Sequence, residues 1–236
     1  MKRFAGLLLL FPLFLFGQPN QSPGDSSRAP KKERHPIGIG IKAGFNFSNV
    51  TSASEVNAGS RTGYHFGVFF APVSHSILGS RTELVYSRHG YTYGHDSSAA
   101  SGNSPGSVDL DYIMLGQYMA FNITKYVQLY LGGETSYLLH AKVDSSTAQI
   151  AAASPQAASI LSYYNRIQAG FGGGVEIHPI SGLVLGAHYS LSLTNLYNTS
   201  SFTSGGSSGP PPSYIPGIGS INPKNNLVQV YLGWRF

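Results

Sequence analysis

From Ile37 to the C-terminus, apolar and polar residues alternate along the chain with a period of two, which is the pattern of β-strands. In the first such stretch, Ile41, Ala43 and Phe45 are separated by Lys42 and Gly44. The pattern predicts eight strands, at about residues 37–48, 61–71, 77–93, 109–122, 127–140, 166–178, 183–194 and 227–236. In the fourth stretch both phases are apolar, so the sequence alone does not decide which face points inward.

The connections between these strands alternate in length. Long segments rich in Ser, Gly, Ala, Asn and Pro cover about residues 49–60, 94–108, 141–162 and 197–226, and short ones cover about 72–76, 124–126 and 179–182. In an up-and-down meander every second connection lies on the same side, so one end carries all the long loops. Short turns on one side, long loops on the other and an even number of strands are typical of outer-membrane barrels.

Alternation by itself fits two kinds of barrel. A soluble lipocalin-like barrel turns its apolar face inward and needs a charged outer face, whereas a membrane barrel turns its apolar face to lipid. Here the polar phase is rich in glycine, as at Gly170, Gly172 and Gly174, and only 11% of the chain is charged. Glycine weakens a solvated strand but leaves room for large side chains inside a narrow barrel. The sequence therefore predicts an all-β, eight-stranded antiparallel up-and-down transmembrane β-barrel.

The residues before the first strand predict a targeting segment and a linker. Lys2 and Arg3 precede an apolar run that ends at Phe16, and the small Gly17 follows, as in a secretory signal peptide. Residues 18–36 are polar and rich in proline, and we interpret them as a disordered periplasmic linker. The predicted organisation is thus a signal peptide at 1–17, a linker at 18–36 and a barrel at 37–236. The absence of cysteine excludes disulfide bonds and a lipoprotein anchor.

Charged residues on the polar phases define the candidate site. An eight-stranded barrel is just wide enough for its interior side chains to fill it, and buried charges must be paired. We therefore expect a network of ion pairs that plugs the lumen, with Lys42 and Glu134 at mid-height. The residues assigned to this network are Lys42, Arg61, Arg81, Glu83, Glu134, Arg166, Glu176 and Arg235, of which Arg81, Glu83, Glu176 and Arg235 are expected near the periplasmic end. A plug favours a structural or interaction role over a narrow channel for small solutes.

Two chemical alternatives fall on the same phases. Ser87 and His89 share one face of a strand, with Asp96 nearby in sequence, and a lipid A deacylase or acyltransferase would use a serine or histidine with a carboxylate in this way. His65, His89 and His188 also lie on polar phases, but a metal site requires three or four converging ligands. We expect these histidines to hydrogen-bond within the lumen, and we predict no catalytic residue, no metal site and no cofactor.

The C-terminus and the long loops indicate partners. The last strand ends on Trp234 and Phe236, an aromatic ending that resembles the signal recognised by the bacterial barrel-assembly machinery. Residues 141–162 and 197–226 are nearly uncharged and are the candidate contact segments for other envelope proteins. We expect Tyr164, beside the first of these loops, to belong to the interfacial aromatic girdle. The other predicted partner is outer-membrane lipid, and no nucleic-acid partner is predicted.

Four short motifs carry a family resemblance. They are Gly40-Ile-Lys-Ala-Gly-Phe-Asn-Phe-Ser48, Glu83-Leu-Val-Tyr-Ser-Arg-His-Gly90, Leu110-Asp-Tyr-Ile113 and Tyr231-Leu-Gly-Trp-Arg-Phe236. With them the chain resembles the PorT-like outer-membrane β-barrel family of Bacteroidota over residues 37–236. The family's usual Tyr-Leu-Glu-Ile-Pro in the fourth strand is replaced here by Tyr112-Ile-Met-Leu-Gly116.

The resemblance implies an integral protein of the Gram-negative outer membrane, without a cofactor. From the strand pattern we expect extracellular long loops and periplasmic termini. The function expected from these features together is that of a small non-enzymatic barrel, and the founding branch of the family points to a subunit of an envelope or secretion-associated complex. The alternatives are a lipid-modifying outer-membrane enzyme and a narrow solute channel.

Overall fold

The structure is a computed structural model of the chain. It describes residues 38–51, 59–72, 77–93, 106–143, 161, 164–197 and 224–236. The predicted signal peptide at 1–17 and the predicted linker at 18–36 lie outside these residues and stay predictions.

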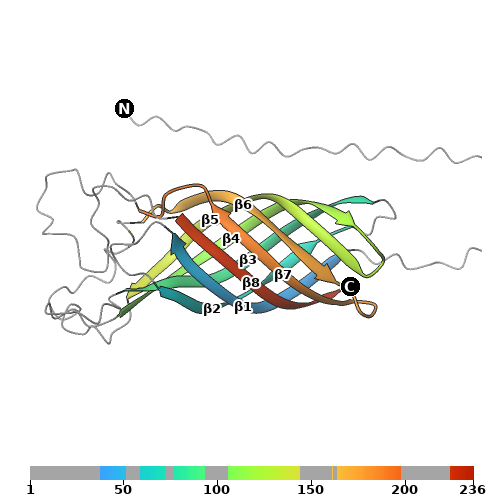
Figure 1. Ribbon diagram of the computed structural model, residues 1–236, viewed down its shortest axis with the longest axis horizontal. Coiled ribbons are helices and arrows are strands. Elements are labelled where there is room, and N and C mark those ends of the chain that lie inside the picture. The colour runs from blue at the N-terminus through green and yellow to red at the C-terminus, as the bar shows by residue number, and fades with distance from the viewer. Residues whose placement is uncertain are drawn as a thin grey trace, which may run out of the picture. The chain divides into compact units, whose positions relative to one another are not determined.

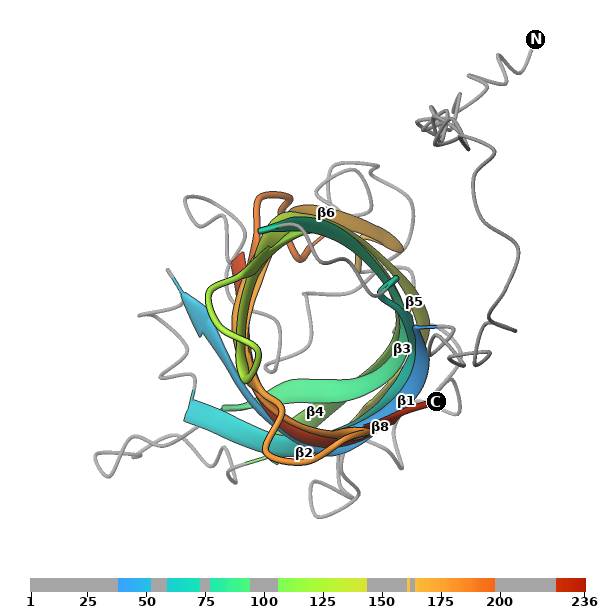
Figure 2. The same ribbon diagram turned by 90° about the vertical axis from the view of Figure 1, so that its right-hand side faces the viewer.

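The described residues form eight strands in one antiparallel sheet that closes on itself (Figures 1 and 2). The strands are β1 (Ile39–Thr51), β2 (Gly59–Phe70), β3 (Leu78–Tyr93), β4 (Gly106–Asn122), β5 (Val127–Val143), β6 (Ile167–Ile177), β7 (Leu183–Ser192) and β8 (Lys224–Arg235). Each strand pairs with its neighbours in sequence, and β8 returns to pair with β1. The predicted eight-stranded up-and-down barrel is confirmed. Across the part of the chain that the structure describes, no helix is long and apolar enough to span a membrane.

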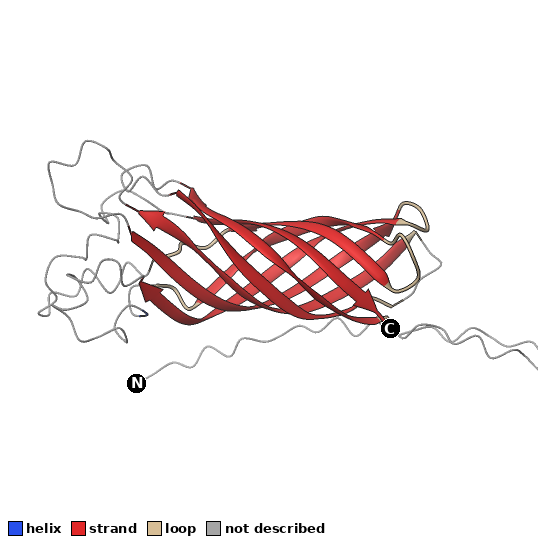
Figure 3. Cartoon of the chain, turned by 90° about the horizontal axis from the view of Figure 1, so that it is seen from below, coloured by secondary structure: helices blue, strands red, loops and turns tan. Residues whose placement is uncertain are grey.

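Tight turns join the strands at one end of the barrel, here called the turn end (Figures 1 and 3). Between β4 and β5, the amide of Ile123 donates to the carbonyl oxygen of Val127 at 3.0 Å. Between β6 and β7, Gly182 has a φ of 89°, in the left-handed region that favours glycine. The C-terminal residue Phe236 lies at the same end, where its amide donates to the carbonyl oxygen of Ile39. The opposite end, here called the loop end, carries the long connections.

Three consecutive strands are longer than the rest, and two of them, β4 and β5, extend three residues further toward the loop end than the sequence predicts. β3, β4 and β5 have 16, 17 and 17 residues, whereas the other strands have 10 to 13. The register shifts twice near that end, between Ser60 and His65 in the β2–β3 pair and between Asp111 and Tyr112 in the β4–β5 pair. Such bulges change which way the neighbouring side chains point, because they interrupt the strict alternation of the strand.

The pleat separates the side chains into an outer and an inner set. Outward side chains are mostly large and apolar, and Phe45 and Leu131 are each 62% exposed. A continuous apolar band around a closed barrel is the surface that lipid requires. The fourth strand, which the sequence left undecided, turns Ile113 outward and buries Tyr112 and Tyr118. Its inner face is therefore aromatic, with hydroxyl groups that find partners inside the barrel.

Candidate functional site

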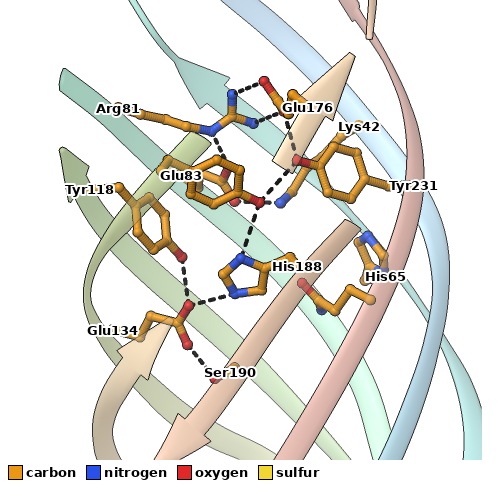
Figure 4. Close-up of polar contacts among 12 residues, drawn as sticks. Lys42, His65, Arg81, Glu83, Tyr118, Glu134, Glu176, His188, Ser190 and Tyr231 are labelled. Carbon is orange, nitrogen blue, oxygen red and sulfur yellow. Dashed lines mark hydrogen bonds and ion pairs between the residues drawn. The ribbon is translucent and has the colours of Figure 1, made fainter. Parts of the chain in front are cut away.

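Buried charged side chains form an ion network in the turn-end half of the barrel (Figure 4). Arg81 on β3 lies between two carboxylates: its Nη1 donates to Oε2 of Glu176 at 2.7 Å, and its Nε pairs with Glu83. Lys42 on β1 forms the second ion pair of Glu83. The side chains of Arg81 and Glu176 are fully buried. These four residues come from β1, β3 and β6, so the closed barrel is needed to bring them together.

Aromatic side chains enclose this ion network. The hydroxyl of Tyr231 donates to Oε1 of Glu176 at 2.7 Å, and the hydroxyls of Tyr130 and Tyr231 are 3.0 Å apart. Nζ of Lys42 lies 4.4 Å from the centre of the Tyr231 ring, within the range of a cation–π contact. A Cβ at Gly186 would lie 2.3 Å from the same ring, so this position has room only for glycine. The interior glycines thus make space for large side chains from other strands.

A second cluster surrounds Glu134 on β5. Tyr118 donates to its Oε1 at 2.8 Å, Nε2 of His188 lies 2.6 Å from the same oxygen, and Ser190 donates to Oε2. Nδ1 of His188 is 3.1 Å from the hydroxyl of Tyr130, which links this cluster to the ion network. We expected Lys42 and Glu134 at mid-height in one network of ion pairs. Lys42 pairs with Glu83, whereas a histidine and two hydroxyls are the partners of Glu134.

A third, uncharged cluster lies nearer the loop end, with Asn46 at its centre. The Asn46 amide nitrogen donates to Oγ of Ser87 at 2.9 Å, and its oxygen is 2.7 Å from Nδ1 of His65. Gln229 donates to the same oxygen at 3.0 Å. These contacts join the neighbouring strands β8, β1, β2 and β3 on the inner face of the barrel.

The serine and histidine of the enzymatic alternative belong to this third cluster. Oγ of Ser87 lies 3.1 Å from Nδ1 of His89, and the His89 ring stacks on Tyr112 with their centres 4.5 Å apart. Both side chains are buried, and the Ser87 hydroxyl also accepts a hydrogen bond from Asn46. Asp96 lies outside the described residues. Within the described part of the chain, no carboxylate contacts this pair.

An apolar plug closes the lumen at the loop end. Its buried members are Val50, Tyr91, Val108, Leu110, Tyr112, Leu138, Ala141, Tyr164, Leu196 and Tyr197. The hydroxyl of Tyr91 lies 2.8 Å from that of Tyr164 and 2.9 Å from that of Tyr197. The expectation for Tyr164 was wrong, because only 2% of this residue is exposed and it points into the barrel, not into a membrane girdle. Residues beside the long loops therefore fold back over the lumen.

The turn end is open, in contrast to the loop end. A cavity of about 830 Å³ there is lined by residues of the three turns together with Gln128, His178 and Arg235. The Arg235 guanidinium lies 5.9 Å from the Phe69 ring, beneath the ion network. Burial, together with the positive charge of Arg235, lowers the pKa of His178 below its ordinary value of 6.5, although Nε2 of His178 is 3.6 Å from Glu176.

Two of the eight residues assigned to the lumen network lie elsewhere. Arg61 forms a bidentate pair with Asp109 near the loop end, with its two nitrogens 2.5 and 3.0 Å from the carboxylate oxygens. The β2 bulge follows Ser60, so the alternation does not carry Arg61 into the central lumen. Arg166 is exposed and contacts the hydroxyl of Tyr137, because β6 begins only at residue 167. Both assignments to the central network were wrong.

Little free space remains between the clusters. A second interior cavity, lined by Glu134, Ser190 and His89 among others, measures about 20 Å³, which is room for about one water molecule. In the part of the chain that the structure describes, no group of three or more His, Asp or Glu side chains is arranged to hold a metal ion. The sequence analysis did not predict that tyrosines line the interior. The available signal was the position of Tyr130, which lies on the same polar phase as Gln128 and Glu134.

The sequence comparison decides the family. The family described as "Outer membrane protein beta-barrel domain" matches residues 16–198 of this chain. The chain belongs to this family. The outer-membrane barrel is accordingly an integral membrane protein, whose apolar outer face is its lipid-facing wall. Among curated proteins, no sequence matches the chain.

Several solved outer-membrane proteins are similar to this outer-membrane barrel at low sequence identity. Neisserial surface protein A (NspA) is 17% identical over 84% of this chain and 97% of its own, with a TM-score of 0.49. The attachment invasion locus protein Ail of Yersinia pestis is 15% identical, with the same coverages and a TM-score of 0.44. OprG of Pseudomonas aeruginosa is 12% identical over 86% of this chain and 97% of its own, with a TM-score of 0.42.

Proposed function

We propose that this chain is a non-enzymatic outer-membrane barrel with a structural or interaction role, acting as a PorT-like subunit of an envelope or secretion-associated complex. One observation carries the proposal: the lumen is filled from the ion network at the turn end to the apolar plug at the loop end. A barrel whose interior is occupied by its own side chains between these two levels offers no path for solutes. The open cavity at the turn end lies outside this filled stretch. We therefore assign the function to the outer surface and the loops.

The ion network favours a lumen that is permanently filled, as opposed to one that is loosely lined with mobile side chains. Breaking a buried pair by removing one partner costs several kcal/mol, because the remaining charge stays in a low-dielectric interior. Arg81 is held by two carboxylates, and Glu83 by two cations. To open a conducting path, several of these pairs would have to separate together.

The proposed contact segments are residues 141–162 and 197–226, at the loop end. Their inner edges, near Leu161 and Tyr197, pack into or against the apolar plug. The bases of both loops are thereby held by the barrel wall. In the proposed orientation these loops are extracellular and both termini are periplasmic, as in other barrels of this architecture.

Crosslinking in intact outer membranes tests the proposed role. The full chain carries a photoreactive amino acid in one of the two loops, and a matched version carries it at Lys125, in the β4–β5 turn. We expect discrete crosslinked envelope proteins with the loop probe and a different set with the Lys125 probe. Identical adducts from both positions would contradict contact through the loops, and a change in the lipid A acylation pattern on deletion of the protein would support the enzyme instead.

A further inference from the structure

Charged side chains gather on the outer face of β3, β4 and β5, near the loop end. On β3 the outward phase ends with Tyr86 and then Arg88. On β5 it continues from Tyr137, past the register shift, to His140 and Lys142. These strands present lipid-type side chains below this level, and both outward-facing tyrosines stand at the transition. The basic belt is defined here as the cationic residues of this level with the carboxylates between them: Arg61, Arg88, His140, Lys142 and Arg166, with Asp109 and Asp111.

The depth of the basic belt follows from strand length. Arg88 is ten residues beyond Leu78, the first residue of β3, and Asp111 is eleven residues before Asn122, the last residue of β4. A tilted transmembrane strand crosses the hydrocarbon core in about 9–11 residues. The first outward charges therefore stand where the hydrocarbon ends and the polar headgroups begin.

Two bidentate pairs organise the basic belt. Arg88 binds Asp111 through Nε and Nη2, at 2.6 and 2.9 Å, and its guanidinium lies 5.3 Å from the centre of the Tyr64 ring. Arg61 binds Asp109 in the same way. A guanidinium has five N–H donors, and each bidentate pair uses two of them, so each arginine keeps three for another ligand. Lys142 is exposed and stands opposite Asp109 in the β4–β5 register.

The described charges of the basic belt leave a positive excess. Among the described residues of this level, three arginines and one lysine stand with two carboxylates, which leaves an excess of two positive charges before any charge on His140. Outward-facing cations are costly at the membrane midplane and cost little near the interface, where anionic headgroups attract them. Fixed, partly paired guanidinium groups with free donors match the geometry of a phosphate.

We propose that the basic belt binds the phosphate of an outer-leaflet lipid, a phosphorylated glycolipid of the lipid A type. The assignment of the leaflet rests on the proposed orientation with the long loops outside. The cations of the basic belt supply the donors to the phosphate, and the acyl chains lie against the apolar wall below. Lipid bound at this position surrounds the bases of the long loops with an ordered headgroup.

Native mass spectrometry of the purified full-length barrel, titrated with bisphosphorylated lipid A, tests this site. The variants are Lys142→Gln, Arg166→Gln and their combination, and the control is Lys125→Gln, which removes one exposed charge at the opposite end. One basic residue near an anionic lipid surface accounts for about a fivefold change in affinity, and the double variant for about 25-fold. Heat-shifted mobility on electrophoresis verifies that each variant is folded.

We expect the fivefold loss for each loop-end variant and none for Lys125→Gln. We also expect no effect of these variants on enzymatically dephosphorylated lipid A, which should bind weakly throughout. An equal loss with Lys125→Gln, or equal binding of phosphorylated and dephosphorylated lipid to the unmodified protein, would overturn the site. Displacement of lipid A by micromolar inorganic phosphate would identify a free-anion site and would also overturn it.

Cysteine labelling separates a failure of the site from a failure of the orientation. The chain has no cysteine, so Lys142→Cys and Thr124→Cys each introduce one thiol. A membrane-impermeant maleimide should label Lys142→Cys in intact cells and Thr124→Cys only after the outer membrane is permeabilised. The reverse pattern would contradict the outer leaflet and the proposed orientation, while the lipid titration would still report on the phosphate site.

Discussion

Replacing Arg81 by methionine tests whether the ion network holds the barrel together. The substitution removes the guanidinium between Glu83 and Glu176 but keeps a long apolar side chain of similar reach. Glu83 still has Lys42, whereas Glu176 keeps the hydroxyl of Tyr231 and loses its buried cation. Removal of one partner from a buried pair costs about 3–5 kcal/mol of unfolding free energy.

Arg88 provides the matched control on the same strand. It also forms a bidentate ion pair, with Asp111, but its side chain is 37% exposed on the outer face. An exposed pair contributes about 0–1 kcal/mol. Arg88→Met should therefore cost several-fold less than Arg81→Met, although both substitutions remove one guanidinium from β3.

Equilibrium urea unfolding in lipid vesicles measures both free energies. Trp234 is the only tryptophan of the chain and lies on the outer face of β8, so its fluorescence reports its departure from lipid. The double variant Arg81→Met with Glu176→Gln should recover part of the loss, because the unpaired carboxylate is then neutral. Equal costs for Arg81→Met and Arg88→Met, with no recovery in the double variant, would refute the structural role of the ion network.

Three further substitutions are followed by the same unfolding assay. In Gly172→Ala the new Cβ would meet the Glu134 carboxylate at 1.7 Å, and the substitution should destabilise the barrel by about 1–3 kcal/mol. In the control Gly133→Ala the new Cβ meets nothing within 4 Å, and the cost should be less than about 1 kcal/mol. Equal costs would contradict the packing described. Tyr91→Phe removes two hydroxyl contacts of the apolar plug and should cost about 1–2 kcal/mol, with faster hydrogen exchange at the loop end; unchanged exchange would contradict a closed plug. Burial lowers the pKa of His178, so below about pH 6.5 the unfolded chain binds a proton that the folded barrel does not, and the free energy of unfolding falls as the pH falls. His178→Gln should remove that part of the pH dependence. An unchanged pH profile of stability would contradict this role of His178.

Most of the fold could be predicted from the sequence, because alternate residues of a membrane-barrel strand face lipid and the barrel interior and differ in polarity accordingly. Lipid requires apolar side chains on one phase of each strand. This requirement identified all eight strands and, for most of them, which side chains face outward. The faces of the fourth strand could not be assigned in this way, because its inner phase is also apolar in composition. Tyr112 and Tyr118 satisfy their hydroxyls inside the barrel, and alternation of hydropathy cannot register such a contact.

The candidate site was predictable in kind but not in its pairing. Alternation correctly indicated that Arg81, Glu83 and Glu176 face the interior, because these residues lie well within their strands. It misplaced Arg61 and Arg166, which stand at a bulge and just before a strand, where alternation no longer holds. Which cation meets which carboxylate depends on barrel closure and strand tilt, and neither is encoded in the spacing of residues along one strand.

The loop-end strand extensions were also beyond the reach of the pattern. From the sequence, Asp109 was predicted to begin its strand and Lys142 to lie in a loop, because charge usually ends a transmembrane strand. In the structure β4 and β5 continue past the hydrocarbon level, and the β4 carboxylates Asp109 and Asp111 pair with Arg61 of β2 and Arg88 of β3. A strand that leaves the membrane no longer needs an apolar face, so its end cannot be found from hydropathy alone.

Ion conductance across a planar bilayer tests the central claim, a permanently filled lumen, most directly. The full-length barrel is inserted into the bilayer, and insertion is verified in parallel by quenching of Trp234 with brominated lipid. A filled lumen predicts no conductance steps above the protein-free baseline, for the unmodified protein and for Arg88→Met alike. Stable steps from the inserted, unmodified barrel would contradict the account and would establish a channel.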